Sequence, residues 1–108
     1  MLQLAVILPT YRERANIAPM VARLDAALQG VAWEAIFVDD NSPDGTADEA
    51  RRISLTDPRV RVIERIGRRG LASAAIEGMC ATAAPIVAVM DADQQHDPEL
   101  LPKMLAAV

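Results

Sequence analysis

The chain has 108 residues with 11 basic and 15 acidic side chains, so it forms one domain at most and carries a net charge of −4. Hydrophobic residues make up 52% of it, which excludes a disordered chain, and the acidic balance leaves no basic face for nucleic acid. A single cysteine, Cys80, excludes an intrachain disulfide and fits a reducing compartment; we expect it to be a buried, small apolar side chain. No secretory signal is visible, and no apolar run approaches the roughly 20 residues of a membrane span.

Short apolar runs alternate with helical patterns along the chain. In order, we expect a strand over 2–8, a helix over 15–29, a strand over 31–38, a helix over 46–55, a strand over 60–63, a helix over 70–83, a strand over 86–90 and a last helix from Pro98. Gly30 is expected to end the first helix, and Thr46 to cap the second in a capping box with Glu49. Asp97 is expected to cap the last helix.

This alternation predicts an α/β fold, a Rossmann-like parallel sheet with helices on both faces. The apolar runs over 5–8 and 35–38 are typical of strands that are buried on both sides. The third strand is short and carries Arg59 and Arg61, which indicates an edge of the sheet. We expect the strand order 3-2-1-4.

Ligands bind to such sheets at the carboxyl ends of the strands, so the loops there are the first place to look. The loop over 9–13 is neither G-x-G-x-x-G nor a Walker A sequence, which disfavours a dinucleotide or P-loop site. Tyr11 could stack on a nucleobase or be a partly exposed loop aromatic. Glu13 could bond a base or ribose, although its position alone favours a role at the start of the next helix.

The second loop begins with two adjacent aspartates, Asp39 and Asp40, whose side chains must point in different directions. One can face a ligand while the other faces the turn, and we assign Asp40 to the nucleoside. Asp44, within Ser-Pro-Asp-Gly, is interpreted as a structural turn residue. In the third loop, Arg68 or Arg69 could meet a phosphate near a helix start, but a solvated basic loop explains them equally.

The fourth loop carries the chemistry of a metal site. The apolar run over 85–89 is followed by Asp91, Asp93 and Gln95, of which Asp93 and Gln95 lie two apart and offer only hard oxygen ligands, so Mg²⁺ or Mn²⁺ suits them better than zinc. His96 lies beside them and is interpreted as a polar neighbour rather than a ligand.

Four segments together resemble a known family. They are LPTYRERANI at 8–17, VDDNSPDGT at 38–46, RRGLASAAIEGM at 68–79 and MDADQQHDPELLPKM at 90–104. In this order and spacing they resemble family 2 glycosyltransferases, nearest to the dolichol- or polyprenyl-phosphate mannosyltransferases and their undecaprenyl-phosphate relatives. The family often has Gly at Ala72, Leu at Gln94 and Pro at Asp97, but none of these departures removes a proposed ligand.

The resemblance implies a GT-A fold, of which residues 1–108 are the N-terminal, nucleotide-sugar-binding half. It implies a nucleoside pocket, a path for the ribose and diphosphate, and a site for Mg²⁺ or Mn²⁺. The implied residues are, for the pocket, Pro9, Tyr11, Glu13, Val38 and Asp40; for the ribose and diphosphate, Asp91 and Ala92; and for the metal, Asp93 and Gln95, with Asp93 also the catalytic residue.

The implied reaction is a metal-dependent, inverting transfer of a sugar from a donor of the GDP-mannose or UDP-glucose type to a polyprenyl phosphate. Because that acceptor is already anionic, no strong general base is required. In the family the acceptor half follows the D-x-D sequence, so we expect the 108 residues alone to be inactive. The chain is expected to be cytoplasmic, and its parent to work at the cytoplasmic face of the membrane.

Two other interpretations remain open. The chain could be a non-catalytic nucleotide-binding or dimerisation module, in which a homodimer covers the open sheet edge. A nucleotidyltransferase ranks lower, because Pro9-Thr10-Tyr11 stands where those enzymes usually carry a loop rich in glycine and basic residues. A receiver-like domain is excluded, because the acidic pair follows the second strand rather than the first.

Overall fold

In the computed structural model, which describes residues 2–66 and 70–90, strands and helices alternate as the sequence predicts. The elements are β1 (Leu4–Thr10), α1 (Arg14–Ala27), β2 (Trp33–Asp39), α2 (Thr46–Ser54), β3 (Val60–Glu64), α3 (Leu71–Cys80) and β4 (Ile86–Val89). The strands pair in parallel in the order β3-β2-β1-β4, which confirms the predicted order and places β3 at an edge. The helix expected from Pro98, with Asp97 as its cap, lies outside the described residues.

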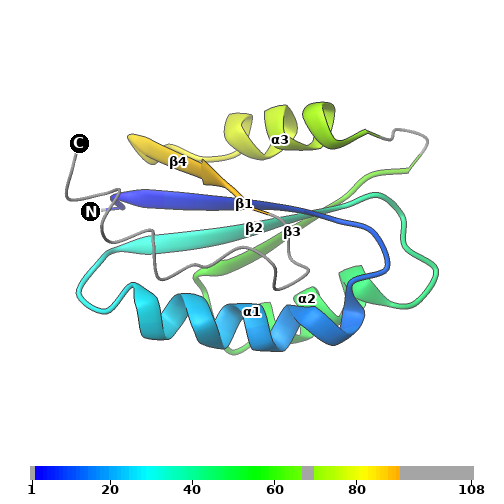
Figure 1. Cartoon of the computed structure of the whole chain (residues 1–108), viewed down its shortest axis with the longest axis horizontal. Helices are drawn as coiled ribbons and strands as arrows, with labels where there is room; N and C mark the ends of the chain where they lie inside the picture. Colours follow the sequence, from blue (N-terminus) through cyan, green and yellow to red (C-terminus); the bar gives the residue numbers. More distant parts are fainter. Residues whose placement is uncertain (1, 67–69, 91–108) are drawn as a thin grey trace.

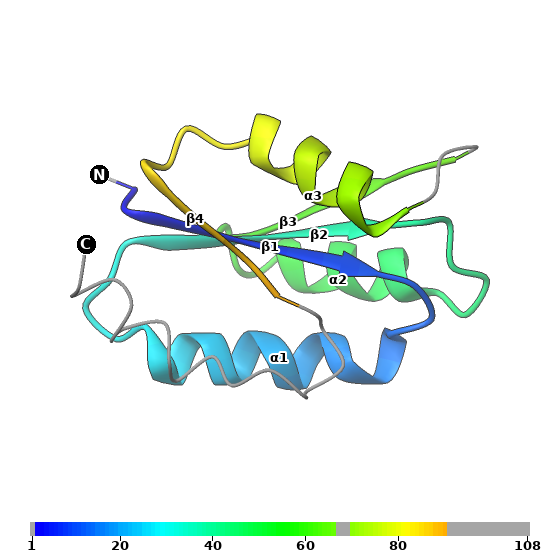
Figure 2. The same ribbon diagram turned by 45° about the horizontal axis from the view of Figure 1, so that its top comes forward.

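Helices cover both faces of the sheet, as expected. Figure 1 shows α1 and α2 on one face and α3 on the other, and the turned view of Figure 2 keeps α3 opposite α1. No helix in the described part of the chain has the length and hydropathy needed to cross a bilayer.

Successive side chains of the central strands point to opposite faces and so build two cores. The core under α1 and α2 includes Leu4, Val6, Leu8, Ile17, Leu24 and Phe37. The core under α3 is formed by Ala5, Ile7, Ile36, Val38 and Ala74. Burial on both sides explains why β1 is apolar from Leu4 to Pro9, and β2 from Trp33 to Val38 apart from Glu34, rather than alternating.

Strand β1 extends to Pro9 and Thr10, two residues beyond the predicted end. The Ile7 backbone faces β4, because its carbonyl accepts from Met90 N, and Pro9 faces the same side two residues later. Proline has no backbone N–H to donate, but pairing with β4 stops at Ile7, so no hydrogen bond between the strands is lost at Pro9. Proline can therefore lie in a central strand here.

The capping box predicted for α2 is wrong. The N-cap is Gly45, with φ +86°, which has no side chain to cap the helix, and Thr46 N in the first turn donates to Asp44 Oδ1 instead. Gly45 takes this left-handed conformation at little cost, and Thr46 becomes the first helical residue. The Thr46 hydroxyl is thereby free to bond other loops, and Glu49 pairs with Arg52 instead.

Helix α3 is shorter than predicted, and the expectation of a buried Cys80 is wrong. The Thr82 hydroxyl donates to Glu34 Oε2 and accepts from Ala84 N, which draws the chain away from the helix after Cys80. Cys80 is exposed. Gly78 lies on the buried face of α3. Cys80 follows two positions later and therefore points about 200° around the helix, away from the sheet.

Candidate functional site

The carboxyl ends of β1, β2 and β3 lie side by side along one edge of the sheet. This edge runs across the strand ends and not along the outer strand β3. The register pairs Pro9 with Val38 and Thr10 with Asp39. Arg65 N donates to the Asp39 carbonyl at 2.7 Å, which brings the exit of β3 alongside. Two residues predicted for the nucleoside pocket, Pro9 and Val38, are therefore neighbours across adjacent strands.

Strand β4 ends at the same edge. Met90 N donates to the Ile7 carbonyl at 2.9 Å, and the Met90 side chain is buried. The chain thus leaves the sheet beside β1 immediately before the D-x-D sequence. Several residues considered above lie outside the described residues: Arg68, Arg69, Asp91, Ala92, Asp93, Gln95 and His96. Among residues 2–66 and 70–90, no group of three or more acidic, histidine or cysteine side chains could hold a metal.

The two adjacent aspartates have separate roles, as expected. Asp39 is fully buried and accepts from Thr10 Oγ1 (2.9 Å) at the end of β1 and from Ser42 N (2.9 Å) and Ser42 Oγ (2.6 Å) in its own loop. The Asp40 side chain is 15% exposed and points toward Arg65. Asp40 is therefore the aspartate whose side chain stays partly exposed at the end of β2.

Arg65, which directly follows β3, is the centre of a buried charge cluster. Its guanidinium is fully buried, with Nε donating to Asp40 Oδ1 at 2.6 Å and Nη1 to Glu77 Oε2 at 2.7 Å. Nη1 also donates to Ser73 Oγ and Nη2 to the Gly70 carbonyl, both at 2.9 Å. Hydrogen bonding to Asp40 raises the pKa of Arg65 against the opposing effect of burial, so the guanidinium remains charged.

Asp40 also accepts from Gly70 N at 3.2 Å, at the start of α3. A carboxylate of the protein itself therefore occupies part of the place considered above for a phosphate. The sequence interpretation passed over Arg65 in favour of Arg68 and Arg69. The register explains why sequence reasoning missed it: Asp39 pairs with Glu64, so the residues that follow the two strands, Asp40 and Arg65, emerge side by side with opposite charges, and no local sequence pattern indicates this pairing.

The loop after β2 holds the start of α1. Its side chains accept from three successive backbone amides: Arg12 N to Ser42 Oγ (2.8 Å), Glu13 N to Thr46 Oγ1 (3.0 Å) and Arg14 N to Asp44 Oδ2 (3.4 Å). These bonds satisfy the amides of Glu13 and Arg14 at the start of α1, which have no partner within the helix, and that of Arg12 just before it. The two loops therefore form one unit.

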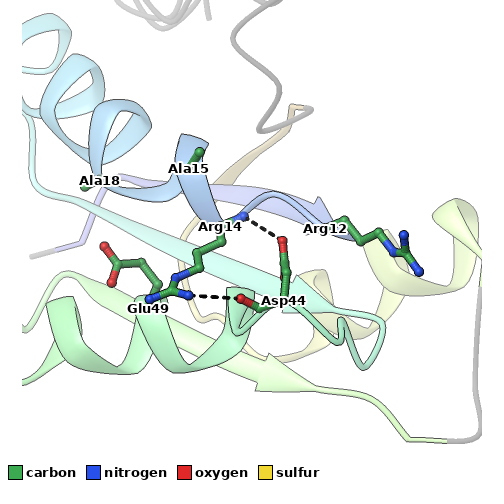
Figure 3. A pocket seen from close by; sticks show the side chains of 6 residues that line it. All are labelled: Arg12, Arg14, Ala15, Ala18, Asp44 and Glu49. Carbon is green, nitrogen blue, oxygen red and sulfur yellow. Dashed lines mark hydrogen bonds between the residues drawn. The ribbon is translucent and has the colours of Figure 1, made fainter.

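Asp44 has the turn role expected of it. It accepts from Thr46 N at 3.0 Å and from the Thr46 hydroxyl. Burial acts to raise the pKa of Asp44, but hydrogen bonds from Thr46 and from Arg14 N outweigh it and lower the pKa. Figure 3 shows Asp44 bonded to Arg14 at the rim of a pocket between α1 and α2. The lining residues are Arg12, Arg14, Ala15, Ala18, Asp44 and Glu49.

The loop after β1 carries Tyr11 and Glu13, the two other residues predicted for the nucleoside pocket. Tyr11 is 40% exposed, and the Arg12 guanidinium carbon lies 5.4 Å from its ring centroid. Arg12 has φ +57° and Asn41, in the facing loop, φ +56°, conformations that cost energy for residues other than glycine and that cluster at functional sites. Glu13 is half-buried and accepts from Asn16 Nδ2 at 2.7 Å, which anchors its carboxylate beside the helix start.

The whole chain matches a protein family. The model of glycosyl transferase family 2 matches residues 5–108. The chain is 44% identical over 107 residues to a dolichol-phosphate mannosyltransferase of Pyrococcus furiosus, covering 99% of this chain and 30% of that protein. It is 40% identical over 107 residues to a polyprenol monophosphomannose synthase of Mycolicibacterium smegmatis, covering 95% and 40%.

Solved structures support the same assignment. A mannosyltransferase from Pyrobaculum calidifontis, in complex with GDP-Man and Mn²⁺, superimposes with a TM-score of 0.71 at 29% identity, covering 84% of this chain and 27% of that one. The structural neighbours are GT-A glycosyltransferases, which confirms the expected fold. The chain spans less than half the length of these proteins. Because the family model matches residues 5–108, the chain belongs to glycosyl transferase family 2.

Proposed function

We propose that this chain forms the donor half of a glycosyltransferase that transfers a sugar from a nucleotide-diphosphate sugar to a polyprenyl phosphate. The observation that carries the proposal is the 44% identity, across 99% of the chain, to a protein named dolichol-phosphate mannosyltransferase. The donor is of the GDP-mannose or UDP-glucose type. The convergence of the strand ends at one edge of the sheet supports a binding site there.

Residues 1–108 are assigned to the nucleotide-sugar-binding half of a larger catalytic domain. The relatives support this, because the matched region covers only 30% and 40% of their lengths. The acceptor site is then built by other residues, and the 108-residue chain alone does not turn over. The parent enzyme works at the cytoplasmic face of a membrane, where a polyprenyl-phosphate headgroup is accessible.

The nucleoside pocket is assigned to the loops after β1 and β2. Its residues are Pro9, Tyr11, Glu13, Val38 and Asp40. Support comes from the pairing of Pro9 with Val38, the exposed ring of Tyr11 and the orientation of Asp40. Asp91 and Ala92, which follow β4 in the sequence, are assigned to the ribose and diphosphate.

A divalent metal, Mg²⁺ or Mn²⁺, would be held by Asp93 and Gln95. Their oxygen donors suit either ion, and β4 directs the chain to the edge where the diphosphate is expected. When bound, the metal stabilises the charge that develops on the leaving nucleoside diphosphate. The chain's own part is to orient the nucleoside, while the anionic acceptor attacks the anomeric carbon without a strong base and inverts its configuration.

A non-catalytic nucleotide-binding or dimerisation module is the second candidate. The observation that favours it is a group of exposed apolar side chains on α3 and the edge strand β4, namely Ile76, Met79 and Val89, at 60%, 48% and 45% exposure. Light scattering of the chain and a transferase assay of the parent distinguish the candidates. A tight dimer of the chain, together with a parent that has no transferase activity, favours the module.

The decisive experiment for the donor site is calorimetric titration of the chain and of its full-length parent with GDP, UDP, GDP-mannose and UDP-glucose, each with and without Mn²⁺. We expect metal-dependent binding that is lost in Asp93→Ala, and the preferred nucleotide identifies the base. Asp48→Ala, on the exposed side of α2, is the control and should bind as wild type. If the folded parent binds no nucleotide, the proposal is wrong.

A further inference from the structure

Arg65 is unusual among the described arginines because its side chain is fully buried and every guanidinium nitrogen donates a hydrogen bond. Arg51, Arg52, Arg59 and Arg61 also form ion pairs, but their side chains are between 39% and 65% exposed. A buried guanidinium is costly unless it is paired and fully bonded. Stability alone does not require such a group at a strand end, where an apolar residue would fill the space.

Its partners come from two separate segments that border the candidate site. Asp40 follows β2, Gly70 precedes α3, and Ser73 and Glu77 lie on the first two turns of α3. Asp40 is held from two directions, with Oδ1 accepting from Arg65 Nε and Oδ2 from Gly70 N. The carboxylate therefore cannot rotate without breaking a charge-assisted hydrogen bond.

We propose that Arg65 is the positioning residue of the nucleoside site, which fixes the Asp40 carboxylate in the orientation that accepts hydrogen bonds from the base or ribose of the donor. This inference rests on the proposed function. Each Asp40 oxygen keeps a lone pair beyond its bond to Arg65 or Gly70, and the side chain remains 15% exposed. A preorganised acceptor binds a nucleoside more tightly than one that must first be ordered.

Lysine cannot replace Arg65 in this role. The guanidinium reaches Asp40 through Nε and Glu77 through Nη1, while Nη2 binds the Gly70 carbonyl. A single ammonium group has no planar fork with which to hold these three acceptors at once. The positioning role therefore depends on the shape of the side chain as well as on its charge.

The test is a double-mutant cycle in the full-length parent, read by calorimetric titration with GDP and UDP in the presence of Mn²⁺. Asp40→Asn and Arg65→Met should each weaken binding of the preferred nucleotide by about tenfold to a hundredfold. In the Asp40→Asn background, Arg65→Met should change the affinity by less than about twofold, because its effect passes through Asp40. The factor by which Mn²⁺ strengthens binding should stay unchanged in Arg65→Met.

Arg59→Met is the matched control. Arg59 also bonds two carboxylates, Asp25 and Asp57, but it precedes β3 and so lies at the opposite end of the strand. This variant should bind nucleotide as wild type even if its melting temperature falls. Should Arg65→Met fail to fold, Arg65→Lys, which keeps the buried charge, replaces it and should still weaken binding severalfold.

The outcomes separate the two proposals. Failure of the wild-type parent to bind GDP or UDP contradicts the proposed function itself. If wild type binds, the positioning role is overturned by wild-type affinity in Arg65→Met or Arg65→Lys. It is also overturned by full additivity with Asp40→Asn, which is the result expected of a merely structural arginine.

Discussion

At the scale of single residues, Asp39 is a buried carboxylate whose side-chain partners all come from the loops beside the candidate site. It accepts from the Thr10 hydroxyl and from both the amide and the hydroxyl of Ser42. Ser42 in turn accepts from Arg12 N. Asp39 therefore connects the end of β1 to both loops, although it contributes no exposed surface itself.

Asp39→Ala should destabilise the protein by about 3 kcal/mol, because three donors lose their acceptor in a buried site. Urea denaturation followed by circular dichroism measures the loss. Asp48→Ala is the control, since the Asp48 side chain is 84% exposed, and it should change stability by less than about 0.5 kcal/mol. Equal stability of the two variants would show that the Asp39 bonds do not hold the loops.

At the scale of elements, α3 packs against the sheet through small residues. A Cβ at Gly78 would stand 2.4 Å from Ile7 Cγ2 and 3.3 Å from Val38 Cγ2, so only glycine fits this crossing. Ala74, one turn earlier, is also buried against the sheet. This close approach brings Glu77 within reach of Arg65.

Gly78→Ala should therefore lower stability by about 1–3 kcal/mol through overpacking, even though alanine favours helices over glycine. The variant should also bind the preferred nucleotide more weakly, because α3 carries two of the Arg65 partners, Ser73 and Glu77. Thermal unfolding and GDP titration measure the two effects. Met79→Ala, at a half-exposed position on the same helix, should leave both nearly unchanged. A stabilised Gly78→Ala variant would contradict the packing argument.

At the scale of the whole molecule, arginine–carboxylate pairs tie together segments far apart in the sequence. Arg59 joins the start of β3 to Asp25 on α1 at 2.8 Å and lies over the Trp33 ring at 4.4 Å.

Hydrogen bonds from Arg59 lower the pKa of Asp57, and those from Arg52 lower the pKa of Glu49. Both carboxyl groups therefore bind a proton less readily in the folded protein than in the unfolded chain.

These lowered pKa values predict the direction of acid unfolding. A carboxyl whose pKa is lower in the folded state stabilises the protein above its unfolded value of about 4 and loses that contribution as the pH falls through the folded value. Melting temperatures measured from pH 7 to pH 2.5 should therefore fall mainly below about pH 4. The difference between wild type and Asp57→Asn should be largest at pH 7 and should narrow in acid, whereas Asp48→Asn should follow wild type throughout. A difference that widens in acid would contradict this assignment.

For the residues that the structure describes, the sequence alone determined the element types and the strand order, and it also indicated the family. These features depend on local patterns: apolar runs of strand length, helical periodicity and turn residues specify each element, and parallel connections leave few possible sheet orders. It also separated the roles of Asp39 and Asp40, because neighbouring residues at a strand end must face different ways. The ligand roles of these and the other pocket residues stay predictions.

Only the tertiary structure decided what the loops contact. Thr46 bonds the start of α1, as Asp44 does, instead of forming a capping box with Glu49, and Cys80 is exposed because Gly78 faces the sheet. The bond of Arg65 to Asp40 spans 25 positions. Such contacts form when strands that are distant in sequence end at the same edge of the sheet. The local sequence around each residue therefore does not indicate which residue it will contact. A buried charge acquires its partners only when the sheet brings them together, and for that reason Arg65 became recognisable only in the folded molecule.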